Sequence, residues 1–264
     1  MAIFQSASTP HSWQPSPLAA GPFQGLQGGA VAGLMVGELE AMAAQDDWGM
    51  AISISAWFLR PVPATTVRTR PSVLSGGGRI TVADNILTAG DDDTPVATLR
   101  ATFSRERAID VPGWDAIAGK DGAAAAEANP QDHELRVPPA PHGRPWFMDN
   151  MEVRDSGTIQ WFGLREPVME GAGPMARTLG PADWTHGIGR PIRGAVGDPN
   201  PNLNVHLFRP PHSHWIGVRP QTHWAPERGV GMGRGVLYDV LGEIGSVSMS
   251  VALVPLPGAA RKPA

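Results

Sequence analysis

The sequence predicts an α+β fold in which a curved antiparallel sheet wraps around a buried helix, and it predicts that this unit occurs twice. Three observations lead to this prediction. One long segment is apolar nearly all round, as a buried helix is. Several segments alternate between apolar and polar residues, as half-buried strands do. Finally, Arg60-Pro61 and Arg70-Pro71 have counterparts 149 residues later, at Arg209-Pro210 and Arg219-Pro220.

The apolar segment predicts a helix over residues 28–44. Gly29, Gly33 and Gly37 lie on one stripe of this helix. Each glycine inside a helix costs about 0.5–1 kcal/mol relative to alanine, so a stripe of three needs a reason. We therefore expect the helix backbone to approach a sheet closely along this stripe. A shorter counterpart is predicted at residues 181–187 in the second half.

The alternating segments predict strands in both halves of the chain. The first half offers 52–59, 80–87 and 96–103, and the second half offers 203–208, 215–224, 230–239 and 246–254. An acidic turn at 90–93 joins two strands of the first half. A turn at Leu241-Gly242 joins the last two strands of the second half as a hairpin. The same order of strands and turns in both halves indicates a duplicated domain.

The middle of the chain differs from both halves. It contains an alanine run, an Asn-Pro and a Pro-Pro pair, and it lacks sustained periodicity. Such composition is typical of a surface linker. We therefore predict an N-terminal domain over 1–108, a linker over 109–144 and a C-terminal domain over 145–264.

Composition excludes several classes of function. The chain has no cysteine, which excludes disulfides, thiolate metal sites and a cysteine nucleophile. A net charge of −4 gives no basic footprint for nucleic acid. The sequence shows neither a signal peptide nor an apolar run of the roughly 18 residues that a membrane span needs. We expect a cytoplasmic protein without a nucleic-acid or membrane partner.

A resemblance to a known family rests on six segments in a fixed order. They are GPFQGLQGGAVAGLMVGELEA (21–41), SAWFLRPVP (55–63), VATLRATFS (96–104), ADWTHGIG (182–189), NPNLNVHLFRPPHSHWIGV (200–218) and LYDVLGEIG (237–245). Together they resemble the double-hotdog acyl-CoA thioesterases. The resemblance implies a tandem, or double, hotdog, each unit a curved antiparallel sheet around a central helix. It implies hydrolysis of an acyl-CoA to free acid and CoA by water attack, without a cofactor. The resemblance leaves open whether two such chains form a homodimer.

The family's catalytic positions fall on three residues of this chain. The family's Asp corresponds to Asn202, its Thr or Ser to Thr222, and its Gln to Ser250 or the neighbouring Met249. In the family the Asp and Gln position the attacking water, and here both are replaced. The resemblance therefore implies a weakened thioesterase that uses Asn202, Thr222 and Ser250. The alternative is a catalytically degenerate protein that binds an acyl or CoA group.

The expected pocket lies between the two halves. Gly28 and Gly29 begin the buried helix, so their N–H groups and the positive end of the helix dipole can stabilise an oxyanion. The alternative is that these glycines only permit tight packing. Trp57, Asn202 and Thr222 are expected to line the same pocket.

Asp183 and His186 are i, i+3 neighbours on the shorter predicted helix, so they can share a substrate-binding site. The alternative for Asp183 is a carboxylate near a helix N-terminus, which the dipole favours. Glu38 and Glu40 are expected at the solvated end of the long helix.

The histidines and one short segment bear on two further functions. A zinc site needs three or four convergent ligands, and the eight histidines are scattered, without an HExxH motif, so we expect no metal. The segment Gly197-Asp198-Pro199-Asn200-Pro201 begins like the signature of hotdog enoyl-CoA hydratases. However, Leu203 stands where that signature has histidine, and the first histidine is His206. A hydratase is therefore the third hypothesis, and we interpret the segment as a turn.

Overall fold

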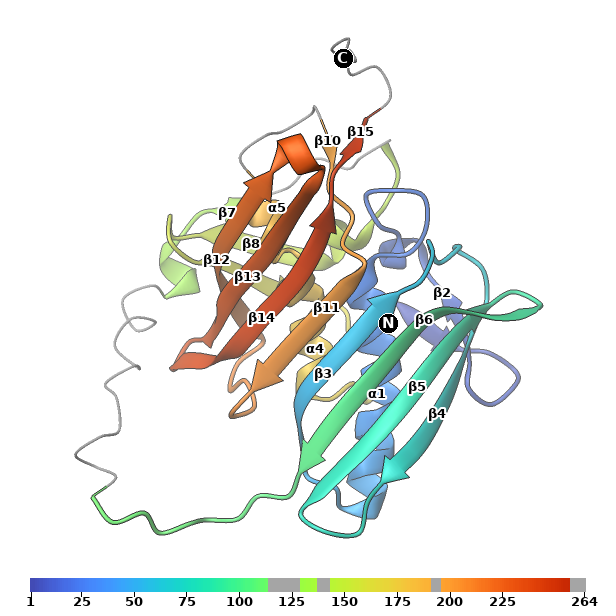
Figure 1. Cartoon of the computed structure of the whole chain (residues 1–264), viewed down its shortest axis with the longest axis vertical. Coiled ribbons are helices and arrows are strands. Elements are labelled where there is room, and N and C mark those ends of the chain that lie inside the picture. Colours follow the sequence, from blue (N-terminus) through green and yellow to red (C-terminus); the bar gives the residue numbers. More distant parts are fainter. Residues whose placement is uncertain (114–128, 137–142, 191–195, 257–264) are drawn as a thin grey trace.

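The computed structural model describes residues 1–113, 129–136, 143–190 and 196–256, which form an antiparallel sheet with its main helices on one face (Figure 1). The sheet has the order β1-β2-β4-β5-β6-β3-β11-β14-β13-β12-β9-β8-β7. A separate pair is formed by β10 and β15. In the described ranges no helix is both long and apolar enough to cross a bilayer.

The bounds of the elements are as follows. The strands of the first half are β1 (Phe4–Ser6), β2 (Ser12–Pro15), β3 (Met50–Phe58), β4 (Val67–Ser75), β5 (Ile80–Ala89) and β6 (Asp92–Ser104). The later strands are β7 (Leu135–Arg136), β8 (Met151–Asp155), β9 (Gln160–Leu164), β10 (Val196–Gly197), β11 (Asn202–Leu207), β12 (Trp215–Ala225), β13 (Val230–Asp239), β14 (Gly242–Ala252) and β15 (Val254–Pro255). The helices are α1 (Gly28–Asp46), α4 (Pro174–Asp183) and α5 (Thr185–Ile188), with short 3-10 turns at Pro17–Ala19, Pro130–Asp132, Phe147–Asn150 and Pro226–Arg228.

The two halves of the chain meet at the centre of the sheet. Strand β3 pairs with β11 in antiparallel register, so that Ile54 lies opposite Val205. Outward from this pair the order is β6-β5-β4 on one side and β14-β13-β12 on the other. Helix α1 lies behind the first group and α4 behind the second (Figure 1). The chain thus repeats one arrangement of four strands and a helix about its central strand pair.

The central strands bury one face and expose the other. Ala56 and Leu203 face the helices and are buried. Trp57, the next residue after Ala56, points to the opposite face and is 50% exposed. This alternation is what the apolar and polar pattern predicted for these strands. We call the face that carries Trp57 the outer face.

The glycine stripe of α1 packs against α4, not against the sheet. A Cβ atom at Gly29 would lie 2.5 Å from the carbonyl oxygen of Leu179, and one at Gly33 would lie 3.1 Å from that of Ala176. The prediction that this stripe approaches a sheet is therefore wrong. The glycines instead allow the backbones of two helices to come together, which larger side chains would prevent.

Helix α1 carries two carboxylates with protein partners, Glu38, which is buried, and Glu40, which is half-buried. Glu38 accepts hydrogen bonds from the indole of Trp13 and the amide of Asn85. Glu40 accepts from the backbone N–H groups of Met175 and Ala176. The prediction of a solvated helix end at these positions is wrong. The helix continues to Asp46, residues of the first half cover Glu38, and the start of α4 contacts Glu40.

The remaining differences from the sequence prediction have local reasons. Helix α4 begins at Pro174, seven residues before the predicted start, because proline is well suited to a first helical turn. Strand β4 contains Pro71, which weakens a strand signal. Strands β8 and β9 lie in a region for which no strand was predicted. Of the predicted linker, residues 114–128 and 137–142 lie outside the described residues.

Candidate active site

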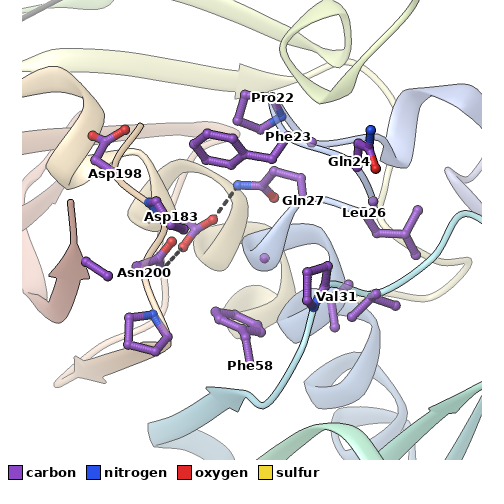
Figure 2. Close-up of a pocket in the computed structure, with 18 of the residues that line it drawn as sticks. Pro22, Phe23, Gln24, Leu26, Gln27, Val31, Phe58, Asp183, Asp198 and Asn200 are labelled. Atoms are coloured by element: carbon purple, nitrogen blue, oxygen red, sulfur yellow. Dashed lines mark hydrogen bonds between the residues drawn. The ribbon is translucent and has the colours of Figure 1, made fainter. Parts of the chain in front are cut away.

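A pocket of about 620 Å³ opens at the N-terminal end of α1 (Figure 2). It lies between the end of β3 and the segment that leads into β11, so both halves of the chain contribute to it. Its walls are largely apolar, with Leu26, Val31, Phe58 and Val62 on the side of the first half. A concave apolar pocket with a few converging polar groups is the usual form of a small-molecule site.

The carboxylate of Asp183 stands at the centre of the polar groups (Figure 2). Its Oδ2 accepts hydrogen bonds from the backbone N–H of Gly29 at 2.9 Å and from Nε2 of Gln27 at 2.5 Å. Its Oδ1 accepts from Nδ2 of Asn200 at 2.7 Å. Asp183 ends α4, yet it binds the first turn of α1, so the antiparallel arrangement of the two helices creates this contact.

Gln27 fixes the orientation of Asp183. It is the N-cap of α1, and its Oε1 accepts from the N–H of Ala30 at 2.6 Å. Its Nε2 is then left to donate to Asp183. One amide therefore satisfies the helix N-terminus and holds the carboxylate, which stabilises the ionised form of the carboxylate.

Burial raises the pKa of Asp183. The nearby His186, the hydrogen bond from Asn200 and that from Gly29 act in the opposite direction and lower it. The net effect is a carboxylate that is more basic than an exposed aspartate and is still held by three donors. Such a group is suited to take a proton from a bound water.

Gly28 brings the start of α1 to the wall of the pocket. Its N–H belongs to the first turn of the helix, whose N–H groups have no partner within the helix. A Cβ atom there would lie 3.0 Å from the ring of Phe58 and 3.2 Å from Oδ2 of Asp183. Glycine therefore keeps the space next to the carboxylate open, and the helix dipole favours negative charge in that space.

His186, Arg190 and Asp198 form a second polar group on the pocket wall. Asp198 is buried, and both of its oxygens accept from Arg190. Nε2 of His186 lies 3.8 Å from Asp198, and burial lowers the pKa of His186. The carboxylate of Asp198 is therefore paired with the guanidinium of Arg190. In the described part of the chain no three His, Asp or Glu side chains are arranged to hold a metal ion.

The structure brings Asn202 and Ser250 together, but on the outer face. The N–H of Ser250 donates to Oδ1 of Asn202 at 2.8 Å, and Nδ2 of Asn202 faces Oγ of Ser250 at 3.4 Å. Trp57 lies opposite Asn202 on the neighbouring strand. None of these three residues lines the pocket, whereas Phe58, next to Trp57, does.

Thr222 lies on β12, apart from Asn202 and Ser250. Its hydroxyl donates to the carbonyl oxygen of Gly189 at 2.8 Å and accepts from the indole of Trp224 at 3.0 Å. It does not line the pocket. The catalytic roles of Asn202, Thr222 and Ser250 therefore stay predictions from the resemblance, while Gly28, Asp183 and His186 do meet at one pocket.

Several polar residues of the pocket are not among the residues predicted from the sequence, and Gln27, Asn200 and Arg190 show why. Gln27 directly precedes the Gly-Gly pair and caps α1, but glutamine is not among the residues that usually mark a helix N-cap. Asn200 lies in the segment that was interpreted as a turn, and only the fold shows that its amide reaches Asp183. Arg190 follows a helix and carries no recognisable motif.

Comparisons with known proteins identify the fold through solved structures. No protein-family model matches the sequence, and no curated protein matches it either. Among solved structures, a protein of Novosphingobium aromaticivorans, assigned provisionally as a thioesterase, is similar with a TM-score of 0.71, 17% identity and coverage of 96% of this chain and 98% of that chain.

Two further structures are similar over nearly the whole chain. A hot dog fold protein of unknown function from Alicyclobacillus acidocaldarius has a TM-score of 0.66 and 16% identity, covering 96% of both chains. The acyl-CoA thioesterase II TesB2 from Mycobacterium marinum has a TM-score of 0.61 and 14% identity, covering 98% of this chain and 97% of that chain. These likenesses show that the chain has a hotdog fold.

Proposed function

We propose that this hotdog-fold chain hydrolyses acyl-CoA thioesters in the pocket at the start of α1, with Asp183 as the base. We further propose that it consists of two hotdog units, over 1–108 and 145–264. The mirrored strand order about β3 and β11, with one main helix behind each group of strands, supports two units. The TesB-type enzyme among the similar structures supports the choice of substrate.

One observation carries the proposal. A buried carboxylate of raised pKa faces an apolar pocket, and the open N-terminus of a helix lies beside it. Thioester hydrolysis needs a base for water and donors for the oxyanion that develops on the carbonyl oxygen. Asp183 supplies the base, and the N–H of Gly28 is the donor.

The reaction follows from this geometry. Water held by the free lone pair of Asp183 attacks the thioester carbonyl carbon, and Asp183 takes the water's proton. The carbonyl oxygen becomes an oxyanion, which the Gly28 N–H and the helix dipole stabilise. When the C–S bond breaks, the proton passes from Asp183 to the leaving sulfur. The products are a free carboxylic acid and CoA with a free thiol.

The apolar walls define where the acyl chain lies. Val31 lies in the first turn of α1 and the Phe58 ring lies beside Gly28 (Figure 2). Leu26 and Val62 also line the pocket. Burial of apolar surface contributes about 25 cal/mol per Å², so an acyl chain along this wall gains affinity from each methylene that it buries.

The experiment is a panel of acyl-CoA thioesters of short, medium and long chain, with detection of the free thiol. We expect hydrolysis of at least one chain length. In the variant Gly28→Ala, the new Cβ crowds Phe58 and Asp183, so hydrolysis should fall. The matched control is Gly78→Ala. Gly78 lies between β4 and β5 and does not line the pocket, and a Cβ atom there would meet nothing within 4 Å.

Two results would contradict the proposal. If the chain hydrolyses no member of the panel but binds one of them, it is the acyl- or CoA-binding protein that the sequence left as the alternative. If Gly28→Ala and Gly78→Ala both hydrolyse at the parent rate, the reaction takes place elsewhere on the chain.

A further inference from the structure

The duplicated sequence places two arginines at equivalent positions, and the structure treats them differently. Arg209 follows β11, and its guanidinium donates to both oxygens of Asp239, at 2.6 and 2.7 Å. It also donates to the carbonyl oxygen of Gly242. Asp239 is buried and is the last residue of β13. Arg209 is therefore a structural residue that fastens β11 to the β13–β14 turn.

Arg60 has no such partner in its own half. The equivalent strand, β5, ends at Ala89, which offers no carboxylate. The ion pair of Arg60 is with Asp92 at 4.0 Å, and both side chains are largely exposed, at 47% and 62%. Oδ1 of Asp92 already accepts from the N–H and the hydroxyl of Thr94. An exposed pair at this distance contributes little, so it leaves the guanidinium available.

The Arg60 guanidinium lies where a substrate can reach it. Arg60 lines the same pocket as Asp183, and its exposure places it at the mouth. The other guanidinium of the described pocket lining, Arg190, is neutralised by the buried Asp198. Of these two guanidinium groups, Arg60 is thus the one whose carboxylate partner, Asp92, is distant and exposed.

We propose that Arg60 binds a phosphate of the CoA moiety at the mouth of the pocket, an inference that rests on the proposed thioesterase function. A guanidinium presents paired donors that match phosphate oxygens. A carboxylate on the acyl group has the same chemistry. However, Arg60 lies at the exposed rim, while the acyl chain occupies the apolar wall near Val31 and Phe58, so the carrier end of the substrate meets Arg60.

The test compares two substrates with the same acyl group, one on CoA and one on pantetheine, which has no phosphate. For Arg60→Ala we expect KM for the CoA thioester to rise about tenfold, with kcat unchanged, because a charge-assisted hydrogen bond is lost. KM for the pantetheine thioester should not change. Arg60→Lys should recover part of the affinity. The control is Arg68→Ala, which removes a nearby exposed charge that pairs with Asp93 and does not line the pocket.

A binding measurement separates this inference from the proposed function. Calorimetric titration of CoA into the parent and Arg60→Ala tests the phosphate contact whether or not the chain hydrolyses thioesters. A roughly tenfold weaker affinity in Arg60→Ala supports the inference even if hydrolysis is absent. Equal affinities of parent and variant for CoA, or an equal rise of KM on both thioesters, would overturn it; the second result assigns Arg60 to the acyl group.

Discussion

The antiparallel helices α1 and α4 bind each other at both ends in the same way, with opposite consequences. At one end, Asp183 of α4 accepts from the N–H of Gly29 in the first turn of α1. At the other end, Glu40 of α1 accepts from the N–H groups of Met175 and Ala176 in the first turn of α4. Each helix therefore supplies a carboxylate to the N-terminus of the other, where the dipole favours negative charge.

The two ends differ in the space around the carboxylate. Asp183 faces the pocket, whereas Glu40 is not among the residues that line it. A Cβ atom at Gly173 would lie 2.4 Å from the carboxyl carbon of Glu40, so chain packs directly against that carboxyl group. A raised pKa is common to both groups, and burial is the main cause in both.

The comparison separates a structural role from a catalytic one. A carboxyl group at a helix N-terminus accepts from N–H groups that have no partner within the helix, and this structural role needs no open space. Only the carboxylate with open space beside it can hold a water and a substrate. Asp183 and Glu40 therefore form a matched pair in one chain, in which one carboxyl group has open space beside it and the other does not.

Replacing a glycine by alanine should destabilise the fold more at the Asp183 end of the helix pair than at the Glu40 end. In Gly29→Ala the Cβ lies 2.5 Å from the backbone oxygen of Leu179 and 2.8 Å from Cβ of Asp183, so the helices must separate. We expect a loss of about 3 kcal/mol in the free energy of unfolding. In Gly173→Ala the nearest atoms belong to the Glu40 side chain, which can shift more easily than a helix backbone, so the loss should be about 1 kcal/mol. Urea unfolding of both variants checks this, and equal losses would contradict it.

Glu40 should make stability depend on pH. Burial raises its pKa from 4.5 to about 7, with the Met175 and Ala176 hydrogen bonds acting against that rise. Its contribution is complete below pH 4.5 and is lost as pH rises toward 7, because the unfolded chain then releases a proton that the folded chain keeps. Relative to Glu40→Gln, the parent should lose about 1–3 kcal/mol between pH 5 and pH 8. Parallel pH dependences of parent and variant would show that Glu40 does not titrate in this way.

Removing the Gln27 side chain should weaken catalysis through Asp183. Gln27→Ala removes one donor to the carboxylate and the cap of α1. We expect kcat to fall about tenfold and stability to fall by about 1 kcal/mol. The acid limb of the pH–rate profile should move to higher pH, since the lost hydrogen bond stabilised the ionised carboxylate.

The control for Gln27→Ala is Gln14→Ala, a surface glutamine that accepts from Thr66 away from the pocket. A lower kcat in Gln27→Ala without any shift of the acid limb would assign Gln27 a purely structural role.

The smallest effect is expected on the outer face. The resemblance predicts that Asn202→Asp with Ser250→Gln restores a water-binding site and raises hydrolysis. The geometry predicts a change of less than about twofold, because neither residue lines the pocket and their polar groups satisfy each other. Thiol release by the double variant decides between these two predictions, and a gain of about 10²-fold or more would favour the resemblance.

The sequence was informative where one local pattern determines the structure. The alternation over 52–59 and 230–239 predicted β3 and β13, and the apolar segment predicted α1 to within two residues. It also placed Gly28 at a helix start and Asp183 close to His186. These features depend on residues that are close together in the chain.

The rest of the site depends on how distant segments meet. Gln27 and Asp183 are 156 residues apart, and only the antiparallel packing of α1 on α4 brings them together. The glycine stripe indicated close approach, but it could not say whether a helix or a sheet approaches. Likewise, a strand register that is read by analogy places Trp57 rather than Phe58 at the pocket, and a shift of one residue exchanges the two faces of a sheet.

The paired variants Asp183→Asn and Glu40→Gln test the central claim most directly. Each replaces a carboxylate by an amide of nearly the same shape. Hydrolysis of the best acyl-CoA is measured in both, with the unfolding midpoint to confirm that both are folded. We predict that Asp183→Asn lowers kcat by about 10²–10⁴-fold, because the general base is lost, while folded Glu40→Gln stays within about twofold of the parent. An Asp183→Asn protein that hydrolyses at the parent rate would contradict the account.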